Sequence, residues 1–350
     1  MTKSPELKQL IADRIRAEGA ITFRDYMAMA LYTPGLGYYT RGNNPIGRAG
    51  DFYTSPTSTP LFGKMLARWL GERFREMGGD VCTIVEMGAA RGVLARDIKA
   101  ALRDELPAGR NDIDYRQIDY GDALPAVDNA CIISNELIDA FPVHRVKMAA
   151  GELREIYVDL DGDRFTEITR PPSTARLPAY FNDLDVSLSD GFTTEINLAA
   201  IDWVRTITDN LARGYVLTID YGYESPELYA PYRSGGTLMG YHRHSYSTDP
   251  YANIGTQDLT SHVNFSALMK YGDDAGLRTI SFATQSDFLS GLGGQEMLAE
   301  LQKRSISDVA ALKDYLAVKG LLMADGMGGV FKVLVQEKTR ASADGRTYSE

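Results

Sequence analysis

Cysteine and histidine are scarce in this 350-residue chain, which contains two cysteines and four histidines. Cys82 and Cys131 lie in apolar runs with a strand-like pattern, so we expect packed free thiols and no disulfide. Two histidines flank Arg243 in the segment 241–244, but no cysteine or acid stands at ligand spacing, and we therefore predict no metal site. This composition is typical of a reducing compartment.

Long apolar runs and an excess of basic residues are also missing. No run approaches the length of a membrane span, and the first six residues lack the features of a secretory or transit peptide. The 37 Lys and Arg residues are outnumbered by 47 Asp and Glu residues, which gives a formal net charge of −10. Because nucleic-acid binding depends on clustered basic side chains, we do not expect a nucleic acid as a partner. The missing membrane span and targeting features predict no membrane partner and a cytoplasmic location.

The most informative segment is residues 83–98, a β-branched run ending at Glu86, then Gly88-Ala89-Ala90-Arg91-Gly92 and a helical pattern. It predicts a buried parallel strand, a tight turn and a helix whose N-terminus points at the turn. The glycine spacing differs from the dinucleotide fingerprint, which disfavours a pyrophosphate ligand. An acid two residues before the first glycine resembles the first motif of class I S-adenosylmethionine (SAM) methyltransferases, where it would hold the ammonium of SAM. An ordinary strand, turn and helix of an α/β core is the alternative.

Helices and a glycine-rich loop precede this segment. Apolar spacing predicts helices over residues 5–18 and 58–77, and Thr22-Phe23-Arg24-Asp25 is typical of a capping box that begins a helix between them. The intervening residues 31–56 combine glycine, proline and tyrosine, which favours an ordered lid; a structural loop packed on the core is the alternative. Residues 1–80 are therefore expected to form a helical and loop extension over the cofactor and substrate cleft.

Several segments, in the same order along the chain, resemble the MidA-like methyltransferases. This family includes a mitochondrial assembly factor that methylates an arginine of a respiratory complex I subunit. The resemblance is carried by residues 31–39, 50–56, 86–92, 134–143, 219–222, 236–238 and 258–265, and it ends near 285–289. The family usually has Gly-Pro-Gly or Gly-Ala-Gly where this chain has Gly88-Ala89-Ala90, so an additional methyl group stands where the backbone meets the ligand.

The resemblance implies a doubly wound, mostly parallel, Rossmann-like α/β sheet, with SAM as the cofactor and a protein arginine as the methyl acceptor. It implies a cofactor site at Glu86, Gly88, Ala90 and Gly92. Two further motifs that match the family add Asp51, Thr54, Ser55 and Asn135 to that site.

Asp119 follows the alternating strand pattern of residues 113–118 and is our candidate for binding the ribose hydroxyls of SAM. About ten residues separate it from the next strand, 130–134, which is too few for a helix and a further strand. Either a βα unit is missing or Asp119 belongs to a different strand. A turn acid before Gly121-Asp122 is the alternative role for Asp119.

Two acids, Glu136 and Asp139, follow the buried strand 130–134, at the carboxyl edge where open α/β sheets bind their ligands. A fixed pair of carboxylates can bind a planar guanidinium by charge-assisted hydrogen bonds and aim one nitrogen at the methyl group. We therefore predict that both are catalytic. The alternative is that Glu136 caps the following turn and that Asp139 is solvated.

His262, with Asp258 four residues earlier, is a further catalytic candidate. An acid at this spacing could tune an imidazole that binds or deprotonates the substrate. A structural, hydrogen-bonding histidine is the alternative. Both residues end a loop-rich stretch, 223–262, that is expected to contact the substrate.

The remaining patterns complete the expected organisation. Residues 81–142 and 196–338 would form the methyltransferase core, and 339–350 a polar tail. The core would be interrupted by an inserted antiparallel meander and loop at 143–195, in which 171–192 is loop, and by the inserted stretch 223–262. Residues 287–319 predict a pair of helices joined at Gly291-Leu292-Gly293-Gly294.

The sequence thus predicts a SAM-dependent methyltransferase, and the resemblance favours a protein arginine as the acceptor. A small-molecule O- or N-methyltransferase is the first alternative, because the tyrosines of the 32–53 and 221–251 loops suit a flat or aromatic substrate. A SAM-binding assembly factor with little turnover is the second, which Ala90 and the short 119–130 link favour. The acceptor, the number of methyl groups and the oligomeric state, a homodimer included, are left open.

Overall fold

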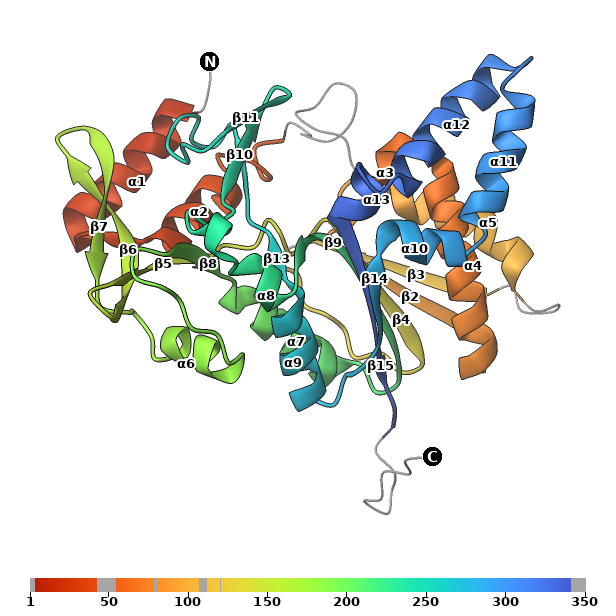
Figure 1. The fold of residues 1–350 in the computed structure, drawn as a ribbon, viewed down its shortest axis with the longest axis horizontal. Helices are drawn as coiled ribbons and strands as arrows, with labels where there is room; N and C mark the ends of the chain where they lie inside the picture. The colour runs from red at the N-terminus through yellow and green to blue at the C-terminus, as the bar shows by residue number, and fades with distance from the viewer. Residues whose placement is uncertain (1–3, 43–54, 79–80, 107–111, 120, 341–350) are drawn as a thin grey trace. The chain divides into compact units, whose positions relative to one another are not determined.

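The computed structural model describes residues 4–42, 55–78, 81–106, 112–119 and 121–340 (Figure 1). The chain forms two compact units. Unit 1 comprises Met1–Thr54, Ile138–Asp202 and Gly222–Leu268, and unit 2 comprises Ser55–Leu137, Trp203–Tyr221 and Met269–Glu350. The expected extension 1–80 is therefore divided, because its residues from Ser55 onward belong to the same unit as the glycine-turn strand.

A mostly parallel sheet lies at the centre of unit 2, with the strand order β14-β15-β9-β4-β2-β3. Four strands are parallel: β3 (Asp112–Ile118), β2 (Val81–Met87), β4 (Ala130–Asn135) and β9 (Gly214–Tyr223). Two strands complete one edge: β15 (Phe331–Lys338) runs antiparallel to β9, and β14 (Arg278–Thr284) pairs antiparallel with β15 and so runs in the direction of the other four. The last two residues of β9 belong to unit 1, where they pair with β13 (Val263–Asn264). The predicted α/β architecture is confirmed.

Helices α4 (Pro60–Met77) and α5 (Val93–Glu105) cover one face of this sheet in unit 2 (Figure 1). Phe62, Leu66 and Leu70 of α4 are buried and repeat at helical spacing, so one face of the helix is turned to the core. The helix begins at Thr59, whose Oγ1 accepts a hydrogen bond from the N–H of Leu61. The apolar side chains of β2, β4, β9 and β15 complete the core.

Short helices follow β14 in unit 2. They are α10 (Gln285–Gly291), α11 (Gly294–Arg304), α12 (Val309–Leu322) and α13 (Met327–Val330). The predicted pair over 287–319 is in fact three helices. Thr284 caps α10, and Gly293, with a φ of 82°, breaks the helix before α11 begins.

The connection between β3 and β4 decides the position of Asp119. The described residues 121–129 form turns and one isolated bridge, from Val127 to Leu211, and contain neither helix nor strand. β3 is the neighbour of β2 at the edge of the sheet, and Asp119 follows it directly. Of the two explanations offered for the short link, the first is therefore correct: a βα unit is missing, and Asp119 follows the strand that pairs with β2.

Unit 1 contains a second sheet, with the order β1-β6-β5-β8 and with β7 paired to β6. Its strands are β1 (Ile21–Thr22), β5 (His144–Ala149), β6 (Glu152–Asp161), β7 (Arg164–Arg170) and β8 (Thr193–Ile196). The predicted antiparallel meander is confirmed, and β1 joins it. Helices α1 (Ser4–Glu18) and α2 (Phe23–Tyr32) share a core with it. The predicted helix start is confirmed, because Thr22 is the N-cap of α2 and its Oγ1 accepts a hydrogen bond from Asp25 N.

The stretches predicted as loops contain regular structure. Helix α6 (Arg176–Asp183) lies within 171–192, where the prediction of loop was wrong because Leu177, Tyr180 and Phe181 bury one side of a helix between polar ends. Residues 223–262 contain α8 (Ser225–Leu228), a 3-10 turn (Pro231–Arg233) and a small sheet of β10 (Met239–His242), β11 (Ser245–Ser247) and β12 (Asp258–Thr260). Helix α3 (Ser55–Ser58) belongs to unit 2, and α7 (Leu198–Asn210) and α9 (Phe265–Asp274) continue from unit 1 into unit 2. Over the described ranges, no helix combines the length and apolar character that a membrane crossing requires.

Candidate cofactor and substrate sites

The glycine turn between β2 and α5 has a backbone that only glycine adopts without strain. Gly88 and Gly92 have φ values of 78° and 65°, in the left-handed region. A Cβ atom at Gly88 would lie 2.9 Å from the Leu137 side chain, and one at Gly92 would lie 2.6 Å from Nε2 of Gln117. Gly92 is the N-cap of α5 and has no side-chain acceptor, so the first N–H groups of the helix can bind an anionic group of a ligand.

Ala90 also lies in the left-handed region, with a φ of 45°. Its N–H donates to Oδ1 of Asp119 at 3.3 Å. A side chain in this region costs roughly 1–2 kcal/mol because Cβ crowds the following carbonyl oxygen. The turn is therefore strained at the position where the MidA-like pattern has glycine.

Glu86 places a buried carboxylate at the end of β2. Its Oε2 accepts a hydrogen bond from the hydroxyl of Tyr115 at 2.9 Å. Burial raises the pKa of Glu86 to about 7, the charge of Asp119 adds to this rise, and hydrogen bonds from Tyr115 and Gln117 oppose it. A cation bound beside this carboxyl group would stabilise its ionised form.

Asp119 lies next to the glycine turn because β2 and β3 are parallel and in register up to the pair Met87 and Ile118. Besides accepting from Ala90, it forms a turn with Asp122: Asp119 N donates to Oδ2 of Asp122 at 3.0 Å, and Asp122 N donates to the Asp119 carbonyl. Asp119 thus combines the two features predicted as alternatives, a turn acid and a carboxylate at the cofactor edge. A role in binding ribose stays a prediction.

Asn135 and Glu136 end β4 with a strained backbone and a buried acceptor. Glu136 has a φ of 52°, and its Oε1 accepts from the N–H of Ser55 and from Nδ2 of Asn135, both at 3.0 Å. Oδ1 of Asn135 is buried and has no hydrogen-bond partner among the residues that the structure describes. Strain and an unsatisfied buried oxygen together are typical of a ligand site. Asp51 and Thr54, predicted for the same site, lie outside the described residues.

In unit 1, the charges of Asp139 and Asp258 raise the pKa values of the same two tyrosines, Tyr39 and Tyr241. Both oxygens of the buried Asp258 carboxylate accept from the hydroxyl of Tyr39 at 2.9 Å. Burial raises the pKa of Tyr39 well above its usual value, and the charges of Asp258 and Asp139 add to this. The pKa of Tyr241 is also raised, first by burial and then by the same two acids. The sequence analysis counted both tyrosines among the aromatic residues of the 32–53 and 221–251 loops, but it did not pair them with these acids.

His262 has surroundings different from those predicted. Asp258 lies in strand β12 (Asp258–Thr260), and His262 follows that strand by two residues, so the pair does not lie on a helix. The ring of His262 packs on Tyr223 with centroids 5.3 Å apart. Burial, and then the charge of Arg233, lower the pKa of His262 to about 4, whereas a carboxylate partner would raise it. A catalytic role for the Asp258 and His262 pair stays a prediction.

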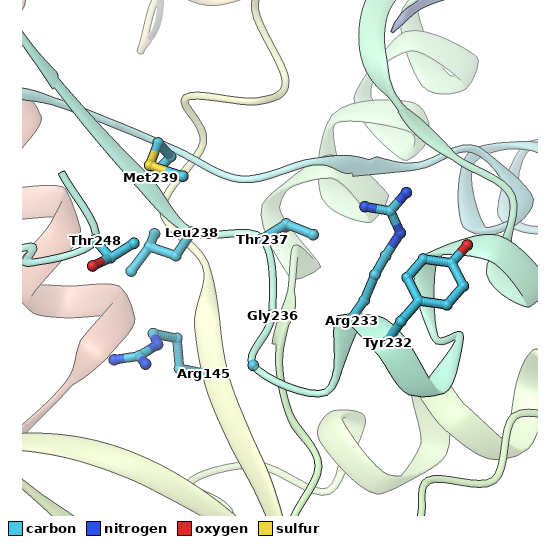
Figure 2. Close-up of a pocket in the computed structure, with 9 residues that line it drawn as sticks. Arg145, Tyr232, Arg233, Gly236, Thr237, Leu238, Met239 and Thr248 are labelled. Atoms are coloured by element: carbon cyan, nitrogen blue, oxygen red, sulfur yellow. The ribbon is translucent and has the colours of Figure 1, made fainter. Parts of the chain in front are cut away.

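A cavity of about 350 Å³ lies in unit 1 beside residues 235–238 (Figure 2). Its lining includes Arg145, Tyr232, Arg233, Gly235, Gly236, Thr237, Leu238, Met239 and Thr248. Glu195 of β8 fixes the wall, because its Oε2 accepts from N and Oγ1 of Thr237 at 2.8 and 3.0 Å. Oγ1 of Thr237 in turn accepts from the N–H of His262 at 3.0 Å. The backbone of His262 thus supports this wall.

Comparison with known proteins identifies the family. Residues 114–283 match a family of S-adenosyl-L-methionine-dependent methyltransferases. A COG1565 superfamily member from Burkholderia thailandensis, whose crystal structure contains S-adenosyl-homocysteine, is 32% identical. The two structures superimpose with a TM-score of 0.83 over 96% of this chain and 92% of that one. The chain belongs to this MidA-like methyltransferase family. It is a SAM-dependent methyltransferase, and SAM is its cofactor.

Curated relatives of this MidA-like methyltransferase carry more specific names. A Caenorhabditis elegans protein, 26% identical over 94% of this chain and 86% of its own length, is named a mitochondrial homolog of the protein arginine methyltransferase NDUFAF7. The Danio rerio NDUFAF7, also mitochondrial by name, is 26% identical over 81% of this chain and 75% of its own. These names contradict the expected cytoplasmic location. The expectation was wrong because it rested on the absence of a membrane span and of a targeting pattern, and such absences do not fix a compartment.

Proposed function

We propose that this methyltransferase transfers a methyl group to an arginine side chain of a protein partner, and that unit 1 recognises the guanidinium. The proposal rests on the buried pair Asp139 and Asp258, whose charges raise the pKa values of Tyr39 and Tyr241. Two carboxylates beside aromatic rings suit a planar cation, through charge-assisted hydrogen bonds and stacking. Relatives named as protein arginine methyltransferases support this acceptor, and the net charge of −10 supports a protein over a nucleic acid.

We assign the cofactor to the carboxyl edge of β2, β3 and β4 in unit 2, where the residues present fit SAM. Glu86 suits its ammonium, because a buried carboxyl with a raised pKa is stabilised by a cation. Asp119 suits the ribose hydroxyls, and the unsatisfied Oδ1 of Asn135 suits a donor of the ligand. Gly88 and Gly92 permit the left-handed turn that brings the N-terminus of α5 to this edge. SAM supplies a methyl group on a sulfonium: the S–CH3 bond breaks as the N–CH3 bond forms, and S-adenosylhomocysteine leaves. The protein mainly has to hold the acceptor nitrogen in line, and the proton that the guanidinium loses would pass to Asp139 or Asp258.

We assign Glu136 and His262 to positioning. Oε1 of Glu136 is held by Ser55 and Asn135, so its carboxylate fixes the start of α3 and the amide of Asn135. His262, with a pKa of about 4, is neutral at pH 7 and too weak a base to take a proton from arginine. The backbone N–H of His262 donates to Oγ1 of Thr237. These assignments favour Asp139 and Asp258 as the acids that contact the acceptor.

Methylation of a panel of arginine-containing proteins and peptides, followed by mass spectrometry, tests the proposal. Asp258→Asn and Asp139→Asn should each lower kcat/KM by about tenfold to a hundredfold, because a charge-assisted hydrogen bond contributes roughly 1.5–3 kcal/mol. SAM affinity, measured by calorimetry, should not change. Asp163→Asn, at an exposed acid of unit 1, is the matched control. Full arginine methylation by both test variants would contradict the proposal.

A small-molecule acceptor is the second candidate. The rings of Tyr32 and Tyr39 are stacked, with centroids 5.5 Å apart and planes inclined by 21°, which favours a flat ligand. Methylation of small phenols or amines, with none of any protein or peptide, would support this candidate. SAM binding without turnover of either class would support an assembly factor, which the strained Ala90 favours.

A further inference from the structure

Gln285, the first residue of α10, has a polar side chain that is fully buried in unit 2. Both ends of its amide are hydrogen-bonded: Nε2 donates to the carbonyl oxygen of Leu321 at 3.3 Å, and Oε1 accepts from the hydroxyl of Ser55 at 3.4 Å. The Leu321 carbonyl fixes this orientation, because a reversed amide would place two acceptors face to face. Since an amide is costly to bury, these two partners indicate what Gln285 does.

The bond to Leu321 anchors Gln285 on α12. Leu321 lies in the last turn of this helix, where carbonyl groups need partners from outside the helix. The neighbouring Ser286 donates from Oγ to the carbonyl of Leu322 at 2.7 Å. Two consecutive residues of α10 thus bind two consecutive carbonyls of α12, and α10 directly follows β14 of the central sheet (Figure 1). The amide of Gln285 is therefore held from both sides along the chain.

The bond to Ser55 connects Gln285 to the end of β4. Ser55 is fully buried and begins the four-residue helix α3. A helix of one turn has little stability of its own, so the position of Ser55 depends on bonds from other elements. The N–H of Ser55 donates to Oε1 of Glu136, which also accepts from Nδ2 of Asn135. Oδ1 of the same Asn135 amide is the buried oxygen that we assign above to a donor of SAM.

We propose that Gln285 is a positioning residue for the cofactor site: through Ser55 and Glu136, it holds the Asn135 amide in the orientation that binds SAM. The inference rests on the assignment of SAM to the carboxyl edge of β2, β3 and β4. Three successive hydrogen bonds join Gln285 to Asn135. Loss of the Gln285 amide should therefore weaken SAM binding, whereas a residue that only stabilises α12 would not affect it.

Calorimetric titration of the full chain with SAM, without any acceptor, tests the proposal. Gln285→Met keeps the length of the side chain and removes both hydrogen bonds, and Ser55→Ala removes only the hydroxyl. Each should raise the dissociation constant of SAM about threefold to tenfold. Ser286→Ala is the matched control, because it breaks the other side-chain bond between α10 and α12. It should leave SAM affinity unchanged even where thermal unfolding shows a similar loss of Tm.

The double variant Gln285→Met with Ser55→Ala should bind SAM no more weakly than Gln285→Met alone, because both changes break the same chain of bonds. Additive losses of affinity would overturn the proposal. So would unchanged affinity in both single variants, or an equal loss in Ser286→Ala. Ser55→Ala, the smaller change, decides the outcome if Gln285→Met does not fold.

Asn135→Ala separates this inference from the assignment on which it rests. This variant should raise the dissociation constant of SAM about tenfold, because it removes Oδ1. If it does so while Gln285→Met and Ser55→Ala bind SAM normally, the role of Gln285 is wrong and the cofactor assignment stands. If Asn135→Ala binds SAM as the wild type does, the assignment fails and the inference fails with it.

Discussion

The hydroxyl of Tyr115 in β3 donates a 2.9 Å hydrogen bond to Oε2 of Glu86 in β2, and so links these two strands beside the glycine turn. This bond favours the ionised form of Glu86, and burial opposes it more strongly, so the pKa of Glu86 rises to about 7. The cofactor edge therefore changes its charge within the physiological pH range. The proposed contact with the ammonium of SAM makes this change measurable.

SAM affinity should rise with pH, with a midpoint near pH 7, because only the ionised Glu86 attracts the ammonium group. Glu86→Gln should lower the affinity about tenfold or more and remove the pH dependence. Tyr115→Phe should move the midpoint to higher pH, since the carboxylate loses a donor. Calorimetry between pH 6 and pH 8 measures all three; a wild-type affinity that does not change with pH would contradict the assignment of Glu86.

The same group should make the ligand-free protein less stable as pH rises. The folded-state pKa lies above the value of 4.5 for an unperturbed glutamate, so the stabilisation is complete below about pH 4.5 and is lost as pH rises through 7. Its size is about 3 kcal/mol at most, at 1.36 kcal/mol per pKa unit. The free energy of unfolding of the wild type, relative to that of Glu86→Gln, should therefore be lower at pH 8 than at pH 5 when both proteins are unfolded in urea.

Ala90→Gly should stabilise the protein by about 1 kcal/mol, because glycine relieves the strain of a positive φ at some cost in unfolded-state entropy. SAM affinity should also increase if the methyl group of Ala90 hinders the ligand. Ala89→Gly is the matched control, since Ala89 has no positive φ and should lose about 0.5–1 kcal/mol. Thermal unfolding and calorimetry measure both; equal destabilisation by the two variants would show that Ala90 is not strained.

Glu136→Gln should retain most of the activity, because the amide oxygen of glutamine can still accept from Ser55 N and Asn135 Nδ2. Glu136→Ala should weaken SAM binding about tenfold, since it releases both donors. Comparing kcat with the SAM dissociation constant distinguishes the roles. A Gln variant that binds SAM normally but transfers no methyl group would show that Glu136 contacts the acceptor directly.

Tyr39→Phe should raise KM for the protein substrate about tenfold with little effect on SAM affinity, because the Asp258 carboxylate loses the donor that orients it. Since the pKa of Tyr39 is raised well above 10, the hydroxyl stays a donor at every working pH. Tyr246→Phe, at an exposed tyrosine of the same unit, is the control. An unchanged KM would remove Asp258 from the proposed acceptor site.

Local patterns in the sequence determined much of this protein. The β-branched run with Gly88 and Gly92 predicted β2, its turn and α5, because strand period, glycine freedom and helix direction depend on neighbouring residues. The helix start at Thr22 was predicted correctly for the same reason. The order of the motifs along the chain was sufficient to identify the family and its cofactor.

Only the tertiary structure decided which distant residues meet. Tyr39 and Asp258 are 219 positions apart, and Ser55 and Glu136 are 81 apart, so no local period relates them. The spacing of Asp258 and His262 does not by itself say whether their side chains meet, because this depends on the local structure, and Asp258 lies in a strand that ends at Thr260. Side-chain partners are set by how sheets and helices pack, which is a property of the whole fold, whereas turns, caps and strand patterns are properties of a few adjacent residues.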